Sequence, residues 1–120
     1  MSDTFALSTE MVNDTCAVFA LDGRLDAVSA QQAKDALQQA INQGRNRLVV
    51  DMRRVSFVDS AGLAALVSAL KLSRRSGGNV VLAGIQPQVH TVFSLTMLDR
   101  IFGIFPDPQA ALHQLTSALS

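Results

Sequence analysis

The sequence predicts an α/β fold, with a mixed, mostly parallel sheet of about five strands and four helices in the order β-β-α-β-α-β-α-β-α. Short apolar runs rich in β-branched residues alternate with stretches whose apolar residues recur every three to four positions. Strands that alternate with helices favour parallel pairing, with helices packed on the sheet. The 120 residues, 48% of them hydrophobic, suffice for one core. No linker or repeat interrupts them, so we treat residues 1–120 as a single domain.

The first two elements are expected to be paired strands. Residues 5–12 alternate loosely between apolar and polar side chains, and residues 16–21 form a continuous apolar run. Residues 13–15, Asn-Asp-Thr, are a turn signal between them. The pair is therefore expected to be antiparallel, with a loop over residues 22–26 leading to the first helix.

That first helix is expected to begin near Ser29, a plausible N-cap, and to end at Gly44. Its apolar residues Ala33, Leu37 and Ile41 follow at intervals of four and share one face. This face is expected to pack on the sheet.

A short β-branched run, residues 48–50, predicts a buried central strand, and residues 52–59 lead from it to the strongest helix of the chain. That helix has apolar residues at i, i+3, i+4 and i+7. Two arginines in its last turn suit the negative end of the helix dipole, and a glycine pair at residues 77–78 stops it. Its inward-facing residues are predicted to be Leu63, Leu66, Val67 and Leu70.

The last third of the chain adds two strands and two helices. Residues 80–83 and 101–105 are predicted strands, and Pro87 suits the first position of a third helix. Asp107 and Pro108 form the usual N-cap and N1 pair of a final helix. The inward-facing residues are predicted to be Val89, Val92, Phe93 and Met97 in the third helix and Leu112, Leu115 and Leu119 in the fourth.

The composition excludes several classes of protein. Ten Lys and Arg balance ten Asp and Glu, whereas a general nucleic-acid binder would be basic. No apolar run approaches the roughly 20 residues that cross a bilayer, and the chain does not begin like a signal peptide. The single cysteine, Cys16, lies in an apolar run and is expected to be a buried thiol. We expect a soluble, cytoplasmic protein without direct nucleic-acid or membrane contact.

No convergent set of catalytic groups is evident. His90 and His113 are isolated, without Cys, Asp or Glu at metal-ligand spacing, and His90 is expected to face solvent. Ser60 lacks the Gly-x-Ser-x-Gly elbow of serine hydrolases. The sequence therefore predicts a protein that is not an enzyme and that uses no metal and no cofactor.

The most informative segment, residues 55–63, leads from a strand into the strongest helix. Ser60 has two explanations there: its oxygen caps free backbone N–H groups, or it carries a phosphate, which the positive end of a helix favours. Gly62 lies in the first helical turn, where glycine costs about 1 kcal/mol relative to alanine. We therefore expect close approach by another chain or group. Arg53 and Arg54 are expected near this end of the fold.

Over nearly its whole length the chain resembles the STAS domain of bacterial anti-sigma factor antagonists. Residues 59–63, Asp-Ser-Ala-Gly-Leu, match the phosphorylation motif of that family, and residues 23–26, Gly-Arg-Leu-Asp, match its Gly-x-Leu-Asp loop. Residues 76–84 and 95–102 resemble the stretches leading into its last two strands. Many members have glycine where this chain has Met97, so the third helix is expected to end differently here.

The resemblance implies a non-enzymatic switch. The unphosphorylated form would bind an anti-sigma factor that has serine-kinase activity and so release the sigma factor. Phosphorylation of Ser60 would end that binding, and a PP2C-type phosphatase would restore it. The residues implied in partner binding are Asp22, Gly23, Arg24, Leu25, Asp26, Asp59, Ser60, Ala61, Gly62 and Leu63.

Two other functions stay open from the sequence. The same fold resembles accessory subunits of lipid-transport complexes and scaffolds of stress-signalling assemblies, which bind constitutively and in which Ser60 would act only as a cap. A small ligand or nucleotide could instead bind between the 22–26 loop and Ser60. Fold alone does not separate these functions.

Overall fold

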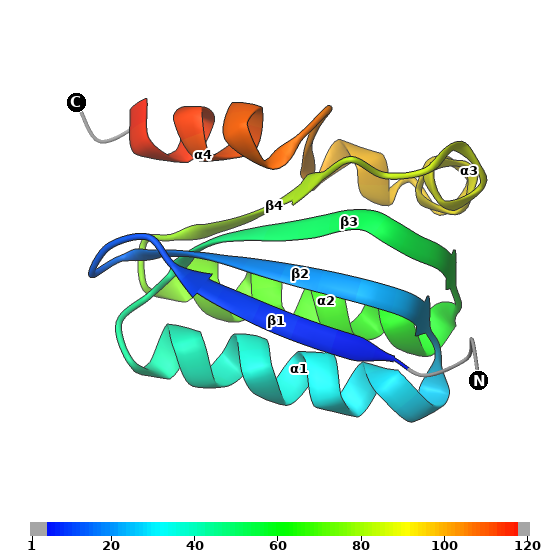
Figure 1. Ribbon diagram of the computed structural model, residues 1–120, viewed down its shortest axis with the longest axis horizontal. Coiled ribbons are helices and arrows are strands. Elements are labelled where there is room, and N and C mark those ends of the chain that lie inside the picture. Colours follow the sequence, from blue (N-terminus) through cyan, green and yellow to red (C-terminus); the bar gives the residue numbers. More distant parts are fainter. Residues whose placement is uncertain (1–4, 118–120) are drawn as a thin grey trace.

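Five strands form one sheet whose spatial order, β1-β2-β3-β4-β5, follows the chain (Figure 1). The computed structural model describes residues 5–117. The predicted element order is confirmed. The elements are β1 (Ala6–Met11), β2 (Cys16–Leu25), α1 (Ala27–Asn42), β3 (Arg47–Val58), α2 (Ser60–Arg75), β4 (Asn79–Ala83), α3 (Pro87–Leu95), the short 3₁₀ helix η1 (Leu98–Arg100), β5 (Gly103–Phe105) and α4 (Pro108–Ser117).

The sheet is mixed, as predicted. β1 pairs antiparallel with β2, and the pairs β2–β3, β3–β4 and β4–β5 are parallel. The side chain of Asn13 closes the β1–β2 turn by accepting hydrogen bonds from the backbone N–H groups of Thr15 (2.9 Å) and Cys16 (2.8 Å). Cys16 is fully buried and free, which confirms the expected buried thiol.

Helices cover the two faces of the sheet unequally. α1 and α2 lie together on one face and α4 lies on the other, while α3 is seen nearly end-on (Figure 1). The larger core cluster joins the sheet to α1, α2 and α3, and the smaller one joins it to α4. Buried side chains of the larger cluster include Phe19, Leu37, Val50, Leu66 and Phe93, and those of the smaller one include Val18, Val49, Val81, Ala111 and Leu115.

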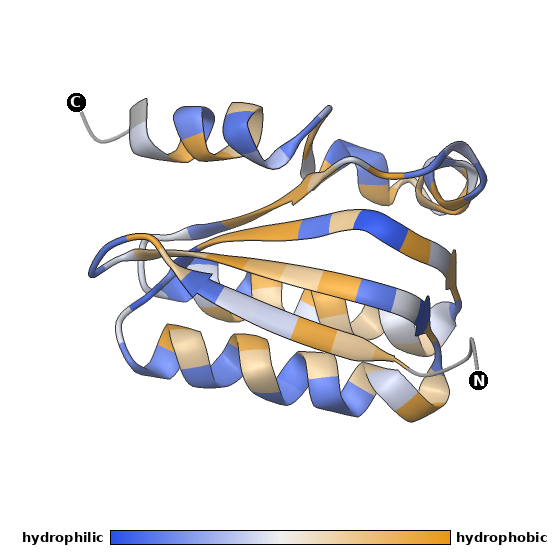
Figure 2. Cartoon of the chain, in the orientation of Figure 1, coloured by the Kyte–Doolittle hydropathy of each residue, from blue (hydrophilic) through white to orange (hydrophobic). Residues whose placement is uncertain are grey.

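β2 and β3 extend further than the sequence indicates, so the predicted loop over residues 22–26 is wrong. Register shifts between Ala20 and Asp22, and between Gly23 and Arg24, let β2 stay paired with β3 to its last residue, Leu25. Gly23 has φ +110°, a conformation that glycine adopts without strain. Figure 2 shows polar, blue segments in β2 and β3 toward their C-terminal ends. The two strands thus bring polar residues to one end of the sheet.

The final strand and helix need smaller corrections. β5 is limited to residues 103–105, because the chain before it turns into η1. Asp107 caps α4 as predicted, accepting a hydrogen bond from the backbone N–H of Ala110 at 2.8 Å. Leu115 is buried and Leu112 is partly buried, whereas Leu119 lies outside the described residues.

The end of α3 contradicts two predictions. Met97 lies beyond the helix, with 59% of its surface exposed, so it is not one of the inward-facing residues. It adopts φ +62°, the left-handed conformation that a glycine at this position would favour. The helix therefore ends in the left-handed conformation even without the glycine, and the expectation of a different ending is wrong.

Replacing Met97 with glycine is expected to raise the free energy of unfolding by about 0.5–1 kcal/mol. Left-handed backbone is unfavourable for a residue with a Cβ, and glycine relieves that strain although it has more conformational freedom to lose on folding. Urea unfolding measures the change. Leu95→Gly is the matched control: Leu95 is exposed but helical, so there glycine should lower stability. Equal losses of unfolding free energy in the two variants would show that the backbone at Met97 is not strained.

Candidate functional site

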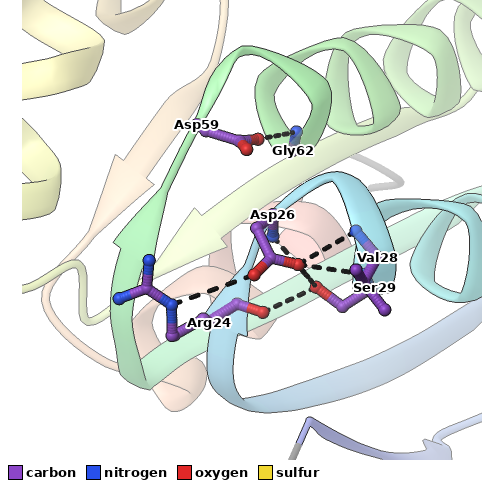
Figure 3. A network of polar contacts seen from close by, with 6 residues as sticks. All are labelled: Arg24, Asp26, Val28, Ser29, Asp59 and Gly62. Carbon is purple, nitrogen blue, oxygen red and sulfur yellow. Dashed lines mark hydrogen bonds and ion pairs between the residues drawn. The ribbon is translucent and has the colours of Figure 1, made fainter. Parts of the chain in front are cut away.

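Two parallel strands end side by side, and each enters a helix through a single aspartate. Asp26 joins β2 to α1, and Asp59 joins β3 to α2. The backbone N–H of Asp59 donates to the carbonyl oxygen of Leu25 at 3.2 Å, which ties the two strand ends together. Figure 3 shows both aspartates aimed at the first turns of their helices. This end of the sheet contains the residues that the sequence implicates in partner binding.

Asp26, and not Ser29, is the N-cap of α1, which corrects the sequence prediction. Its carboxylate accepts from the backbone N–H groups of Val28 (3.0 Å) and Ser29 (3.2 Å), and the Ser29 hydroxyl accepts from the Asp26 N–H at 3.0 Å. These bonds form a reciprocal capping box. The backbone hydrogen bond from Ser29 holds the pKa of Asp26 below its usual range, and the nearby Arg24 charge adds to that effect.

Asp59 is the N-cap of α2, which leaves Ser60 without a structural task. The Asp59 carboxylate accepts from the backbone N–H of Gly62 at 3.0 Å. Ser60 is the first residue of the helix and is exposed, and within the described part of the chain its hydroxyl has no hydrogen-bond partner. The explanation of Ser60 as a cap is therefore wrong, because its neighbour provides the cap.

The close approach expected at Gly62 is confirmed, and the approaching group is the backbone of Leu25 in the same chain. A Cβ at Gly62 would collide with the carbonyl oxygen of Leu25 and lie 2.9 Å from its Cγ. Leu25 and Leu63 are also buried. The side chains of Leu25 and Leu63, like the Cα of Gly62, are thus not available at the surface, and these residues shape the site by holding α2 against the end of β2.

Charged and aromatic side chains surround the strand ends. The guanidinium carbon of Arg24 lies 4.0 Å from the centre of the Phe57 ring, and its Nε lies 3.8 Å from the Asp26 carboxylate. Arg54 pairs with Asp22 at 3.7 Å. Because these pairs are solvent-exposed, they add little to stability, and their groups are free to change partners.

Arg53, which the sequence also places near this end, is held elsewhere. Its guanidinium forms two hydrogen bonds, at 3.0 and 2.9 Å, with the nearly buried carboxylate of Asp51. Those bonds raise the pKa of Arg53 above its usual value. Arg53 is therefore committed to an ion pair in the middle of β3.

A hollow of about 250 Å³ lies between α1 and α2. Alanines form most of its lining, including Ala61 and Ala64 of α2, with Lys34 of α1 at its side. Asp22 lines a different hollow, of about 330 Å³, over β1, β2 and β3. Ser60 lines neither of these hollows, so they do not support a small-ligand site between the 22–26 segment and Ser60.

Two absences apply to residues 5–117. In that range no group of three or more His, Cys, Asp or Glu side chains is arranged to hold a metal ion. No helix there is long and apolar enough to span a membrane. His90 is exposed, as expected.

The fold and the strand-end site define a small α/β domain with an exposed serine at the start of its second helix. Residues 9–111 match the family model described as STAS domain, and the chain belongs to that family. The anti-sigma-B factor antagonist of Listeria monocytogenes is 33% identical over 68% of this chain and 72% of that protein. The anti-sigma F factor antagonist of Paenibacillus polymyxa is 26% identical over 79% and 82%.

Solved structures agree with the sequence relatives. The anti-sigma factor antagonist SpoIIAA in its unphosphorylated form has a TM-score of 0.83 and 25% identity, over 93% of this chain and 97% of that one. An anti-sigma factor antagonist from Mycobacterium paratuberculosis has a TM-score of 0.81 and 26% identity, over 97% of both chains. A relative of a different kind is the intermembrane phospholipid transport system binding protein MlaB of Escherichia coli, 32% identical over 75% of this chain and 87% of that protein.

The lowered pKa of Asp26 predicts a specific dependence of stability on pH. Because its pKa is depressed in the folded protein, the stabilisation is fully present above the unfolded value of about 3.9. It is lost as the pH falls through the lower, folded value. Asp26→Asn keeps a good N-cap but removes the charge. We expect the wild-type protein to be more stable than this variant near neutral pH, with the difference shrinking below about pH 4.

Urea unfolding of both proteins across this pH range measures the effect. Asp14→Asn, at an exposed turn residue, is the matched control for the loss of one carboxylate. If the difference in stability between wild type and Asp26→Asn stays constant down to the lowest pH, the charge of Asp26 does not contribute to capping.

Proposed function

We propose that this protein is an anti-sigma factor antagonist controlled by phosphorylation of Ser60. Its unphosphorylated form binds an anti-sigma factor that has serine-kinase activity, and this binding releases the sigma factor. The observation that carries the proposal is the exposed, unbonded hydroxyl of Ser60, next to an aspartate that already caps the helix. The relatives named as anti-sigma factor antagonists support the same role.

Phosphorylation changes the charge of the strand-end site. The kinase transfers the γ-phosphoryl group of a nucleoside triphosphate to the Ser60 oxygen. The new O–P bond replaces the bond to the leaving nucleoside diphosphate, and the hydroxyl proton passes to a base. The phosphate adds about −1.5 to −2 charges beside the carboxylates of Asp26 and Asp59. A partner surface shaped for a neutral hydroxyl then loses affinity through bulk, repulsion and desolvation.

A modest energy change is enough for this switch. A 100-fold loss of affinity corresponds to about 2.7 kcal/mol, within the range of one to three charge-assisted contacts. A PP2C-type phosphatase, which needs access to the same exposed side chain, would restore the binding form by hydrolysing the phosphate. In this role the protein is cytoplasmic, has no catalytic activity of its own and does not contact nucleic acid or membrane directly.

The second candidate function is a constitutive interaction subunit without a phosphorylation switch. The similarity to MlaB, named as a binding protein of a phospholipid transport system, favours it. In such a subunit the charge at Ser60 would have no regulatory effect. The two functions therefore differ in how partner affinity responds to a negative charge at this position.

Substitution of Ser60 separates the two functions. Ser60→Ala is expected to bind the partner with wild-type affinity and to accept no phosphate, whereas Ser60→Asp is expected to bind at least about tenfold more weakly. Partner retrieved from the source cells with wild-type protein is purified and titrated by calorimetry, and mass spectrometry locates the phosphate.

Ser8→Asp is the matched control, because Ser8 is an exposed serine on β1 and should tolerate the same charge. Equal affinities of wild type and Ser60→Asp would favour the constitutive subunit. Phosphate found on another residue would remove Ser60 from the central role.

A further inference from the structure

Arg24 lies at the end of β2, and only weak contacts hold its guanidinium there. Its side chain is 46% exposed, and its Nε lies 3.8 Å from the Asp26 carboxylate, beyond hydrogen-bond distance. Its other contact is the face of Phe57, at 4.0 Å. Figure 3 shows the guanidinium on the same side of the strand ends as Asp26, with Asp59 beyond it. Neither contact binds the guanidinium through a hydrogen bond.

The strand register places Arg24 within reach of Ser60. Arg24 is opposite Phe57, and the next residue of β2, Leu25, accepts the hydrogen bond from Asp59. Ser60 therefore lies three residues beyond the partner of Arg24 on the neighbouring strand. Asp59 is extended, so strand geometry, with about 4.8 Å between strands and about 3.3 Å per residue, gives a Cα separation of roughly 11 Å for Arg24 and Ser60. An arginine and a phosphoserine side chain together cover that separation.

The other charges nearby are less suited to a phosphate on Ser60. Asp26 and Asp59 would repel it. Arg54 lies further from the strand end and is paired with Asp22. Lys34 and Ala61 line the same hollow, so Lys34 is the other cation that could pair with the phosphate.

We propose that Arg24 is the residue that responds to phosphorylation: its guanidinium leaves Phe57 and Asp26 and binds the phosphate on Ser60. This inference rests on the proposed phosphorylation of Ser60. A bidentate guanidinium–phosphate pair is stronger than an exposed cation–π contact or an exposed ion pair, so the exchange is favourable. Phe57, already 37% exposed, then loses its cover. Phosphorylation thus changes the surface at Phe57 as well as at Ser60.

The test uses the full chain with phosphoserine introduced at position 60 during translation, so that it does not depend on a kinase. Phosphorus NMR follows the second ionisation of the phosphate, whose ordinary pKa is about 6. A neighbouring cation favours the dianion and lowers this pKa. We expect it to be about one unit lower in the otherwise wild-type protein than in Arg24→Gln. Arg24→Lys should fall between them, since it keeps the charge but loses the planar fork.

Arg54→Gln and Lys34→Gln are the matched controls and should leave the phosphate pKa unchanged. As a second readout, the ring signals of Phe57 should shift on phosphorylation with arginine at position 24 and stay unshifted in Arg24→Gln. The same phosphate pKa with and without Arg24, or a change that follows Lys34 instead, would overturn the inference.

Different results would disprove the proposed function and the proposed role of Arg24. If no kinase modifies Ser60 in cells, the proposed function fails while the NMR result is unaffected. If Ser60→Asp releases the partner but Arg24→Gln leaves the phosphate pKa unchanged, only the role of Arg24 is wrong.

Discussion

The parallel pairing of β2 and β3 up to their last residues is the constraint on which the site depends. The hydrogen bond from Asp59 to Leu25 fixes the two strand ends at the same level, so α1 and α2 begin side by side. Gly62 then lets the first turn of α2 pack directly against the backbone of Leu25. A larger residue there would move the helix, and with it Ser60, away from β2.

Two aspartates with the same structural task produce the chemical character of this end. Each caps a helix, which satisfies backbone N–H groups that would otherwise need another partner. Because Asp59 caps α2, Ser60 stays exposed with a carboxylate on the residue directly before it. A phosphate added at this serine lies next to the Asp59 carboxylate, and Arg24 is a nearby cation whose guanidinium forms no hydrogen bond within residues 5–117. The arrangement links the fold of the strand ends directly to the proposed switch.

Much of the fold is predictable from the sequence because it depends on local patterns. Apolar periodicity places the helices, β-branched runs place the central strands, and Asn13 predicts the first turn. The extension of β2 through residues 22–25 is not predictable in this way, because Asp and Gly are typical of loops and only pairing with β3 makes them a strand. The left-handed conformation of Met97 is likewise not predictable, because it goes against the local preference of a residue with a Cβ.

The candidate site likewise combines features that local sequence predicts with features that depend on distant parts of the chain. The resemblance to anti-sigma factor antagonists singles out Ser60, whereas its freedom from capping depends on where the helix begins. Asp59 and Ser60 are both good N-cap residues, and one residue of offset decides which of them caps. The reason for Gly62 lies in a strand 37 residues earlier in the chain, at Leu25. No local signal reports such a contact.

The claim that Asp59 performs the capping and leaves Ser60 free is tested most directly by the free energies of unfolding of two alanine variants. Asp59→Ala should lose about 1 kcal/mol, the usual contribution of an N-cap. Ser60→Ala should stay within about 0.5 kcal/mol of the wild-type protein, as an exposed residue without a hydrogen-bond partner does. A loss at Ser60 equal to or larger than that at Asp59 would contradict the account, because the serine would then be a structural cap.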